Sequence, residues 1–158
     1  MSELRDTYPD ALFVVSHRDP VQTLASLCKL THVLRSVSYG EADNDKHQVG
    51  KDIWHFVQTH VDHLLDYRRS SGDTAIVDVD YRQLIESPTE VVQAVYTAAG
   101  MEFPDSVRTE IADWAAKNPK GKRGVNSYNL EDYGLDRDAV EAGFADYRRA
   151  FNIPLENG

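Results

Sequence analysis

The chain has 158 residues, 41% of them hydrophobic and 27% charged, and these proportions predict one folded domain with a sizeable core. The net charge of -9 excludes a general nucleic-acid binder, which needs a basic face, but allows a small anionic ligand at a local basic cluster. The single cysteine excludes a disulfide framework, and no apolar run reaches the length of a membrane span. We therefore expect a cytoplasmic protein.

The first half of the chain is predicted to contain one strand and the start of a helical region. The continuous apolar run Leu12 to Val15 is typical of a fully buried, parallel strand. Asp19 and Pro20 then predict a helix start, with Asp19 as the cap and Pro20 at the first helical position. Apolar residues at helical spacing continue this helix to about Val37.

A surface loop and a second long helix are predicted next. Residues 39–50 are polar, charged and bounded by glycines, which favours a loop. From Lys51 apolar residues again recur at helical spacing, and Gly72 marks the predicted stop. Residues 74–79 then indicate a second strand.

The second half of the chain is predicted to be mostly helical. Ser87 to Glu90 has the spacing of a capping box and opens a helix that stops at Gly100. Phe103 and Pro104 begin another helix, and residues 118–134 read as a long loop. Asp136 caps a last helix that carries apolar residues as far as Phe151.

Two strands separated by helices predict an α/β layered fold. The helices could cover a larger parallel sheet, yet two strands alone make a poor one. We therefore expect residues 1–158 to form a single domain that is part of something larger or pairs with another chain.

The strand-to-helix turn carries the strongest candidate for a ligand site. Arg18 supplies a planar fork of donors, and Ser26, eight positions on, supplies a hydroxyl from the following helix. Backbone donors at the helix start also favour an anion. This pattern is typical of phosphate binding. In the alternative interpretation, Arg18 pairs with Asp19 or Asp78 and Ser26 merely faces its own helix.

A second basic segment runs from Lys117 to Gly124. It contains four cations and no acid, and its two glycines let a backbone approach a ligand closely. Two such sites would suit a doubly phosphorylated nucleotide. A solvated basic loop is the alternative.

Other candidate residues are weaker. Tyr81, at the end of the second strand, is well placed to contact a base, but a half-buried core tyrosine would look the same. His17 could contact a ligand or act as a general base, although a structural histidine fits better. His60 and His63 could bind a metal only weakly, so we expect no metal site. The Walker phosphate loop and the dinucleotide fingerprint are absent from the sequence.

Together these segments resemble the sulfotransferases that use 3′-phosphoadenosine 5′-phosphosulfate (PAPS). The stretch from Phe13 to Ser26 is similar to the 3′-phosphate motif of that family, and residues 79–88 to the segment whose tyrosine contacts adenine. Residues 120–124 resemble the late glycine-containing loop, and residues 129–135 the bacterial branch. The resemblance implies that Arg18 and Ser26 hold the 3′-phosphate and that Tyr81 contacts the adenine. It also implies that a loop covers the 3′-phosphate and that this loop consists of Lys120, Gly121, Lys122, Arg123 and Gly124.

The resemblance implies an incomplete three-layer domain like that of the P-loop NTPases, with PAPS as co-substrate and a hydroxyl on a small molecule, lipid or carbohydrate as acceptor. Two features depart from the family. Pro119 stands where the family has arginine, and no counterpart of the 5′-phosphosulfate loop or of the usual catalytic base precedes Arg18. We therefore expect the C-terminal portion of a sulfotransferase domain, inactive alone, that self-associates or binds a complementing N-terminal half.

Two other functions are compatible with these residues. One is a non-catalytic module that binds 3′-phosphonucleotides or assembles with a partner. The other is a nucleotide-dependent kinase relative with the same layered fold, and the missing phosphate loop counts against it.

Overall fold

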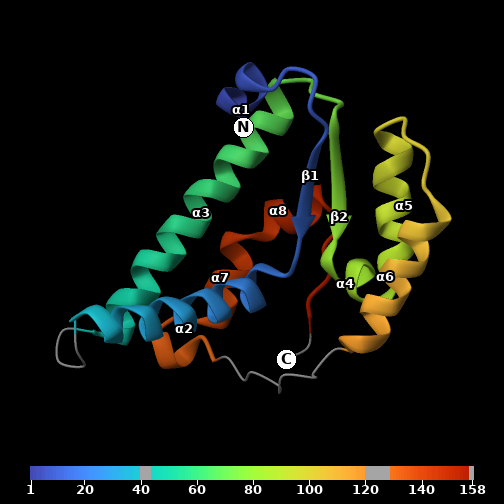
Figure 1. Ribbon diagram of the computed structural model, residues 1–158. Helices are drawn as coiled ribbons and strands as arrows, with labels where there is room; N and C mark the ends of the chain where they lie inside the picture. Colours follow the sequence, from blue (N-terminus) through green and yellow to red (C-terminus); the bar gives the residue numbers. More distant parts are fainter. Residues whose placement is uncertain (40–43, 120–128, 157–158) are drawn as a thin grey trace. The chain divides into compact units, whose positions relative to one another are not determined.

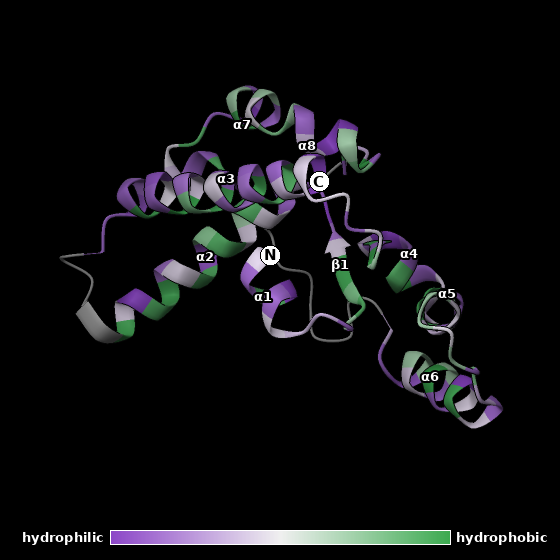
Figure 2. Ribbon diagram, turned by 90° about the horizontal axis from the view of Figure 1, so that it is seen from above, coloured by the Kyte–Doolittle hydropathy of each residue, from purple (hydrophilic) through white to green (hydrophobic). Residues whose placement is uncertain are grey.

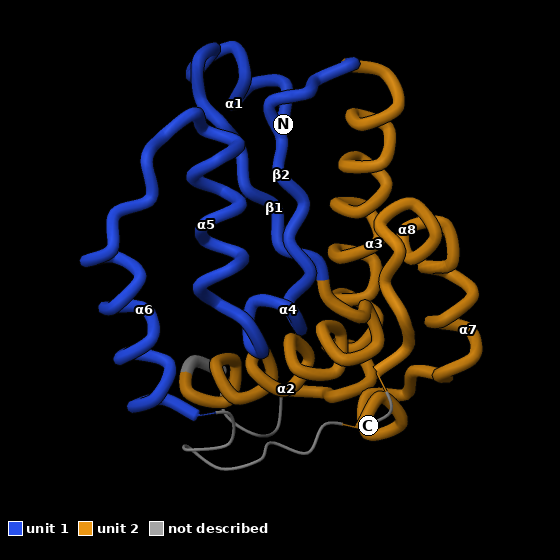
Figure 3. Tube along the Cα trace, turned by 90° about the vertical axis from the view of Figure 1, so that its right-hand side faces the viewer, with its two compact units in different colours: residues 1–17, 72–126 blue, residues 18–71, 127–158 orange. Residues whose placement is uncertain are grey.

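The computed structural model describes residues 1–39, 44–119 and 129–156 (Figure 1). They form an α/β structure with two parallel strands and many helices, which confirms the predicted fold class. The chain divides into two compact units (Figure 3). Unit 1 comprises residues 1–17 and 72–126, and unit 2 comprises residues 18–71 and 127–158.

Unit 1 contains the sheet. Strand β1 (Phe13–His17) pairs in parallel with β2 (Ile76–Asp80) (Figure 1), and the register runs from Phe13 opposite Ile76 to His17 opposite Asp80. The prediction of a fully buried first strand is wrong, because Val14 is 50% exposed. Burial alternates along β1, as expected for a strand whose two faces have different surroundings.

The N-terminal helix α1 (Ser2–Thr7), which the sequence analysis did not predict, is joined to the sheet by one arginine. Arg5 forms a two-pronged ion pair with Asp73, which lies just before β2. The same guanidinium donates to the carbonyl oxygens of Ala11 and Ala75 and lies 4.4 Å from the centre of the Phe13 ring. This one side chain therefore connects the segments that lead into both strands.

Three further helices of unit 1 follow β2: α4 (Tyr81–Glu86), α5 (Pro88–Ala98) and α6 (Asp105–Lys117). The short helix α4 was not predicted, and Asp80 caps it by accepting the N–H of Arg82. The prediction of a capping box is wrong, because the Ser87 side chain makes no cap hydrogen bond. Proline does occupy the first turn of α5, as predicted. None of these helices contains a fully buried residue.

Unit 2 begins with two long helices, α2 (Pro20–Tyr39) and α3 (Lys46–Ser70), which contact each other. Hydrophobic and hydrophilic residues are interspersed along both, as amphipathic helices require (Figure 2). The predicted loop over residues 39–50 is too long. Helix α3 starts at Lys46 because the extended residue Asp45 accepts the N–H of His47 at 2.8 Å and so caps the helix.

The rest of unit 2 consists of a short 3-10 turn, η1 (Glu131–Tyr133), and the helices α7 (Arg137–Gly143) and α8 (Ala145–Ala150). The turn falls within a segment that the sequence analysis assigned to a loop. Asp136 caps α7 as predicted, by accepting the N–H of Ala139 at 2.8 Å. The predicted single last helix is wrong, because Phe144 has ψ of 13°, outside the helical range, and separates α7 from α8.

The hydrophobic core lies in unit 2, where apolar residues of α2, α3, η1 and α7 pack together. Its least exposed side chains are Leu24, Cys28, Val49, Val140, Leu130 and Phe144, each at most 1% exposed. Burial raises the pKa of the Cys28 thiol to about 11, so the thiol stays protonated at neutral pH. Among the described helices, none has the length and apolarity needed to cross a membrane.

Candidate functional site

Arg18 lies directly after β1 and before α2, as predicted, and its guanidinium is paired with a carboxylate. Arg18 Nε donates to Glu156 Oε1 at 3.3 Å, and Nη2 donates to Oε2 at 3.2 Å. The two side chains are 33% and 20% exposed, so solvent reaches the pair. One edge of the planar Arg18 guanidinium therefore binds both oxygens of the Glu156 carboxylate.

The neighbouring Asp19 is fully buried and binds two backbone amides. Its Oδ1 accepts the N–H of Val21 at 3.0 Å, which confirms it as the cap of α2. Its Oδ2 accepts the N–H of Glu156 at 2.7 Å. Asp19 therefore fastens the C-terminal segment to the start of α2, beside Arg18.

Ser26 lies on α2, six residues after Pro20, and is half-buried. Six residues of helix correspond to about 9 Å along the axis. Both residues belong to unit 2. Their convergence on one anion stays a prediction.

The other predicted nucleotide contacts belong to a different part of the chain. Tyr81 is the first residue of α4 and is half-buried. Hydrogen bonds from Arg82 hold the pKa of the adjacent Asp80 below its usual value. The candidates Lys120, Gly121, Lys122, Arg123 and Gly124 lie outside the described residues. The assignment of all these residues to a nucleotide stays a prediction.

His17 has a structural partner. Its ring is 3% exposed, and its Nε2 lies 2.9 Å from Asp78 Oδ1 on the neighbouring strand. This arrangement agrees with the structural interpretation of His17, and it gives Asp78 a partner other than the one the sequence analysis considered. His60 Nδ1 contacts the carbonyl oxygen of Phe56 at 2.7 Å. Across residues 1–39, 44–119 and 129–156, no three potential metal ligands gather.

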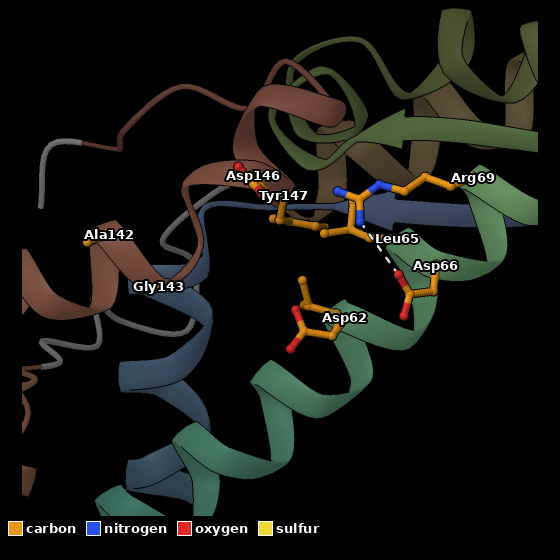
Figure 4. Close-up of a pocket in the computed structure, with 9 residues that line it drawn as sticks. Asp62, Leu65, Asp66, Arg69, Ala142, Gly143, Asp146 and Tyr147 are labelled. Atoms are coloured by element: carbon orange, nitrogen blue, oxygen red, sulfur yellow. Dashed lines mark ion pairs between the residues drawn. The ribbon is translucent and has the colours of Figure 1, made fainter.

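A polar cavity of about 430 Å³, which the sequence patterns did not predict, lies in unit 2 between α3 and the residues at the junction of α7 and α8. Figure 4 shows Asp62 and Asp66 of α3 and Asp146 of α8 around it, with Arg69 paired to Asp66 at 3.5 Å. Three carboxylates against one guanidinium repel a phosphate. The cavity is therefore unsuited to an anionic nucleotide, and only the i, i+4 spacing of Asp62 and Asp66 hinted at it.

A second, apolar hollow of about 360 Å³ lies in unit 1, between the sheet and helices α4 and α5. Its lining is almost entirely aliphatic: Val14, Ser16, Val79, Leu84, Val91, Val92 and Val95. Valines of α5 and Val14 of β1 contribute to this lining, so two largely apolar surfaces face each other. Ser16 is the one polar side chain in this lining.

Comparisons with known proteins identify a family and a similar solved structure. A family model described as "Sulfotransferase family" matches residues 1–105. The crystal structure of sulfotransferase STF9 from Mycobacterium avium is similar, with 28% sequence identity and a TM-score of 0.89. The similarity covers 99% of this chain and 40% of the mycobacterial chain, so the present chain spans less than half of that protein. Among curated proteins, no sequence matches.

Proposed function

The chain belongs to the sulfotransferase family, and on that premise we propose that Arg18 binds the 3′-phosphate of PAPS as co-substrate. The observation that supports this role most directly is the pairing of Arg18 with both oxygens of Glu156. A guanidinium that holds a carboxylate in this way has the geometry to hold a phosphate. Ser26 would add a hydroxyl donor from α2.

In the reaction of the complete domain, the oxygen of an acceptor hydroxyl attacks sulfur. The bond between sulfur and the bridging phosphate oxygen breaks, and adenosine 3′,5′-bisphosphate leaves while a base takes the hydroxyl proton. The residues assigned here hold the far end of the nucleotide and orient it. Tyr81 would contact the adenine, and residues 120–124 would close over the 3′-phosphate.

We also propose that this chain transfers no sulfuryl group by itself. The residues assigned here hold the far end of the nucleotide, and none of them is assigned to the 5′-phosphosulfate or as the base that the reacting end needs. The acceptor would be a hydroxyl of a small molecule, lipid or carbohydrate.

The test is calorimetric titration of the purified chain with adenosine 3′,5′-bisphosphate, compared with adenosine 5′-monophosphate. We expect preferential binding of the bisphosphate. Arg18→Ala should weaken it by roughly 1.5–3 kcal/mol, or about 10- to 150-fold, because a charge-assisted hydrogen bond is lost. Ser26→Ala should weaken it less.

Arg137→Ala is the matched control, since Arg137 is an exposed arginine of α7 in the same unit. It removes the same charge and should leave the affinity within about twofold of the parent. Equal affinities for Arg18→Ala and the parent chain would refute the site.

The second candidate function, a non-catalytic assembly module, is favoured by the exposure of the sheet. Val14 is 50% exposed and lines the apolar hollow of unit 1. Such a surface suits association with a second copy or with a complementing half. Sedimentation across a concentration series would detect self-association, and a monomer at all concentrations would argue against that form of the proposal.

A further inference from the structure

We propose that Glu156 sets the anion affinity of Arg18, because its carboxylate occupies the donors that a phosphate needs and must be displaced when the phosphate binds. This inference rests on the proposed role of Arg18 in nucleotide binding. It adds a residue 138 positions away in the sequence that no feature near the strand-to-helix turn indicates. Glu156 would act on the ligand through Arg18.

The carboxylate of Glu156 lies along one edge of the Arg18 guanidinium, as a bound oxyanion would. Nε and Nη2 of Arg18 each donate to a separate oxygen of Glu156. The distances of 3.3 and 3.2 Å exceed the roughly 2.7–2.9 Å typical of strong charge-assisted hydrogen bonds. A long pair that solvent reaches is weak enough for a better acceptor to replace.

The main chain of this segment is fixed more firmly than the Glu156 side chain. The N–H of Glu156 binds the buried carboxylate of Asp19 at 2.7 Å. Three residues earlier, Ile153 is 7% exposed and packs in a cluster with Leu65 and Tyr147, and its N–H binds the carbonyl of Arg148 at 2.9 Å. The backbone can therefore stay attached while the Glu156 side chain rotates away from Arg18.

The electrostatics give the direction of the effect. The chain carries a net charge of -9, so each cation near the proposed site matters for attracting an anion. A carboxylate on Arg18 neutralises that cation, and it would repel a phosphate that bound beside it. Removing the negative charge of Glu156 without changing its shape should therefore tighten phosphate binding.

The experiment compares the parent chain with Glu156→Gln by titration with adenosine 3′,5′-bisphosphate. Glutamine preserves the size of the side chain and the backbone N–H that binds Asp19. We expect the Kd to fall about two- to fivefold, the amount that corresponds to a partly exposed ion pair. Glu131→Gln is the matched control, since Glu131 is an exposed glutamate of the same unit, and it should change the Kd less.

The outcomes separate this inference from the proposed function. The competitor role is supported if Glu156→Gln binds more tightly than Glu131→Gln and if this gain disappears when Arg18 is also replaced by alanine. It is also supported if Glu156→Gln binds the bisphosphate and the parent chain does not. Binding by the parent that depends on Arg18, with no gain or a loss in Glu156→Gln, overturns the competitor role and leaves the nucleotide site standing. Binding by neither chain overturns both.

Discussion

The two units of this chain differ in how they bury apolar residues. In unit 2, helices α2, α3 and α7 enclose side chains such as Leu24 and Val140 that are completely buried. In unit 1, the sheet and helices α4 and α5 line an apolar hollow, and Val14 remains half exposed. The helical unit therefore holds the hydrophobic core, while the unit that contains the sheet is only partly packed.

This contrast is unusual for an α/β protein, in which a parallel sheet normally forms the centre of the core. Here the described sheet has two strands, so each strand has only one hydrogen-bonded neighbour. Apolar residues in the strand sequence thus need not be buried in this chain. Apolar residues of a strand indicate a surface that can pack against another element, and they can do so while remaining exposed.

The largest expected effect comes from removing one phenylalanine side chain from each unit. Phe144 of unit 2 is 1% exposed, and Phe144→Ala should lower the free energy of unfolding by about 3–5 kcal/mol because it leaves a cavity. Phe103 of unit 1 is half-buried against Tyr96, and Phe103→Ala should cost less than about 2 kcal/mol.

The chain has one tryptophan in each unit for this measurement, Trp54 in α3 and Trp114 in α6. Urea unfolding of single-tryptophan variants would report each unit separately. Equal losses for the two phenylalanine variants would contradict the packing difference.

A smaller effect is expected where α3 passes close to η1. A methyl group at Gly50 would overlap the backbone carbonyl oxygen of Tyr133. Although alanine is the better helix former, Gly50→Ala should destabilise the chain by about 1–3 kcal/mol through overpacking. Gly143→Ala is the control, because its Cβ would lie an ordinary 3.6 Å from Trp54, and thermal unfolding should show little change or a slight gain.

The smallest expected effect lies in unit 1, at the start of α4. Hydrogen bonds from Arg82 lower the pKa of Asp80. The stabilisation from this pair is therefore present above the usual aspartate pKa of about 3.9. It is lost as the pH falls through the lowered pKa of the folded state. Asp80 is partly exposed, and the contribution should stay below about 1 kcal/mol. Asp80→Asn should therefore flatten the loss of stability as the pH falls below about 3.9, whereas Asp113→Asn, at an exposed position of α6, should not.

The sequence patterns predicted the strands and long helices well, and their failures have local causes. The start of α3 was missed because Lys46 to Gln48 are polar and the cap at Asp45 is recognisable only once the backbone turns there. Helix α4 was missed because six residues are too few to show helical spacing. The last helix was predicted as continuous because Val140, Phe144, Tyr147 and Phe151 keep helical spacing across the break at Phe144.

The candidate site was only partly accessible to sequence reasoning. The residues next to it in the sequence predict that Arg18 follows a strand and that Asp19 caps a helix, and the structure has both features. The partner of Arg18 was sought among acids nearby in sequence or on the next strand. Glu156 could not be found in this way, because its position depends on the packing of Ile153 and on the acceptor at Asp19, which are tertiary contacts.

The buried thiol of Cys28 has a practical consequence. It is the one cysteine in the sequence, it is fully buried in unit 2, and its pKa of about 11 keeps it unreactive at neutral pH. A colorimetric disulfide reagent can therefore modify it only when the surrounding helices separate. The rate of that colour change would time how often the interior opens, with no label or substitution introduced.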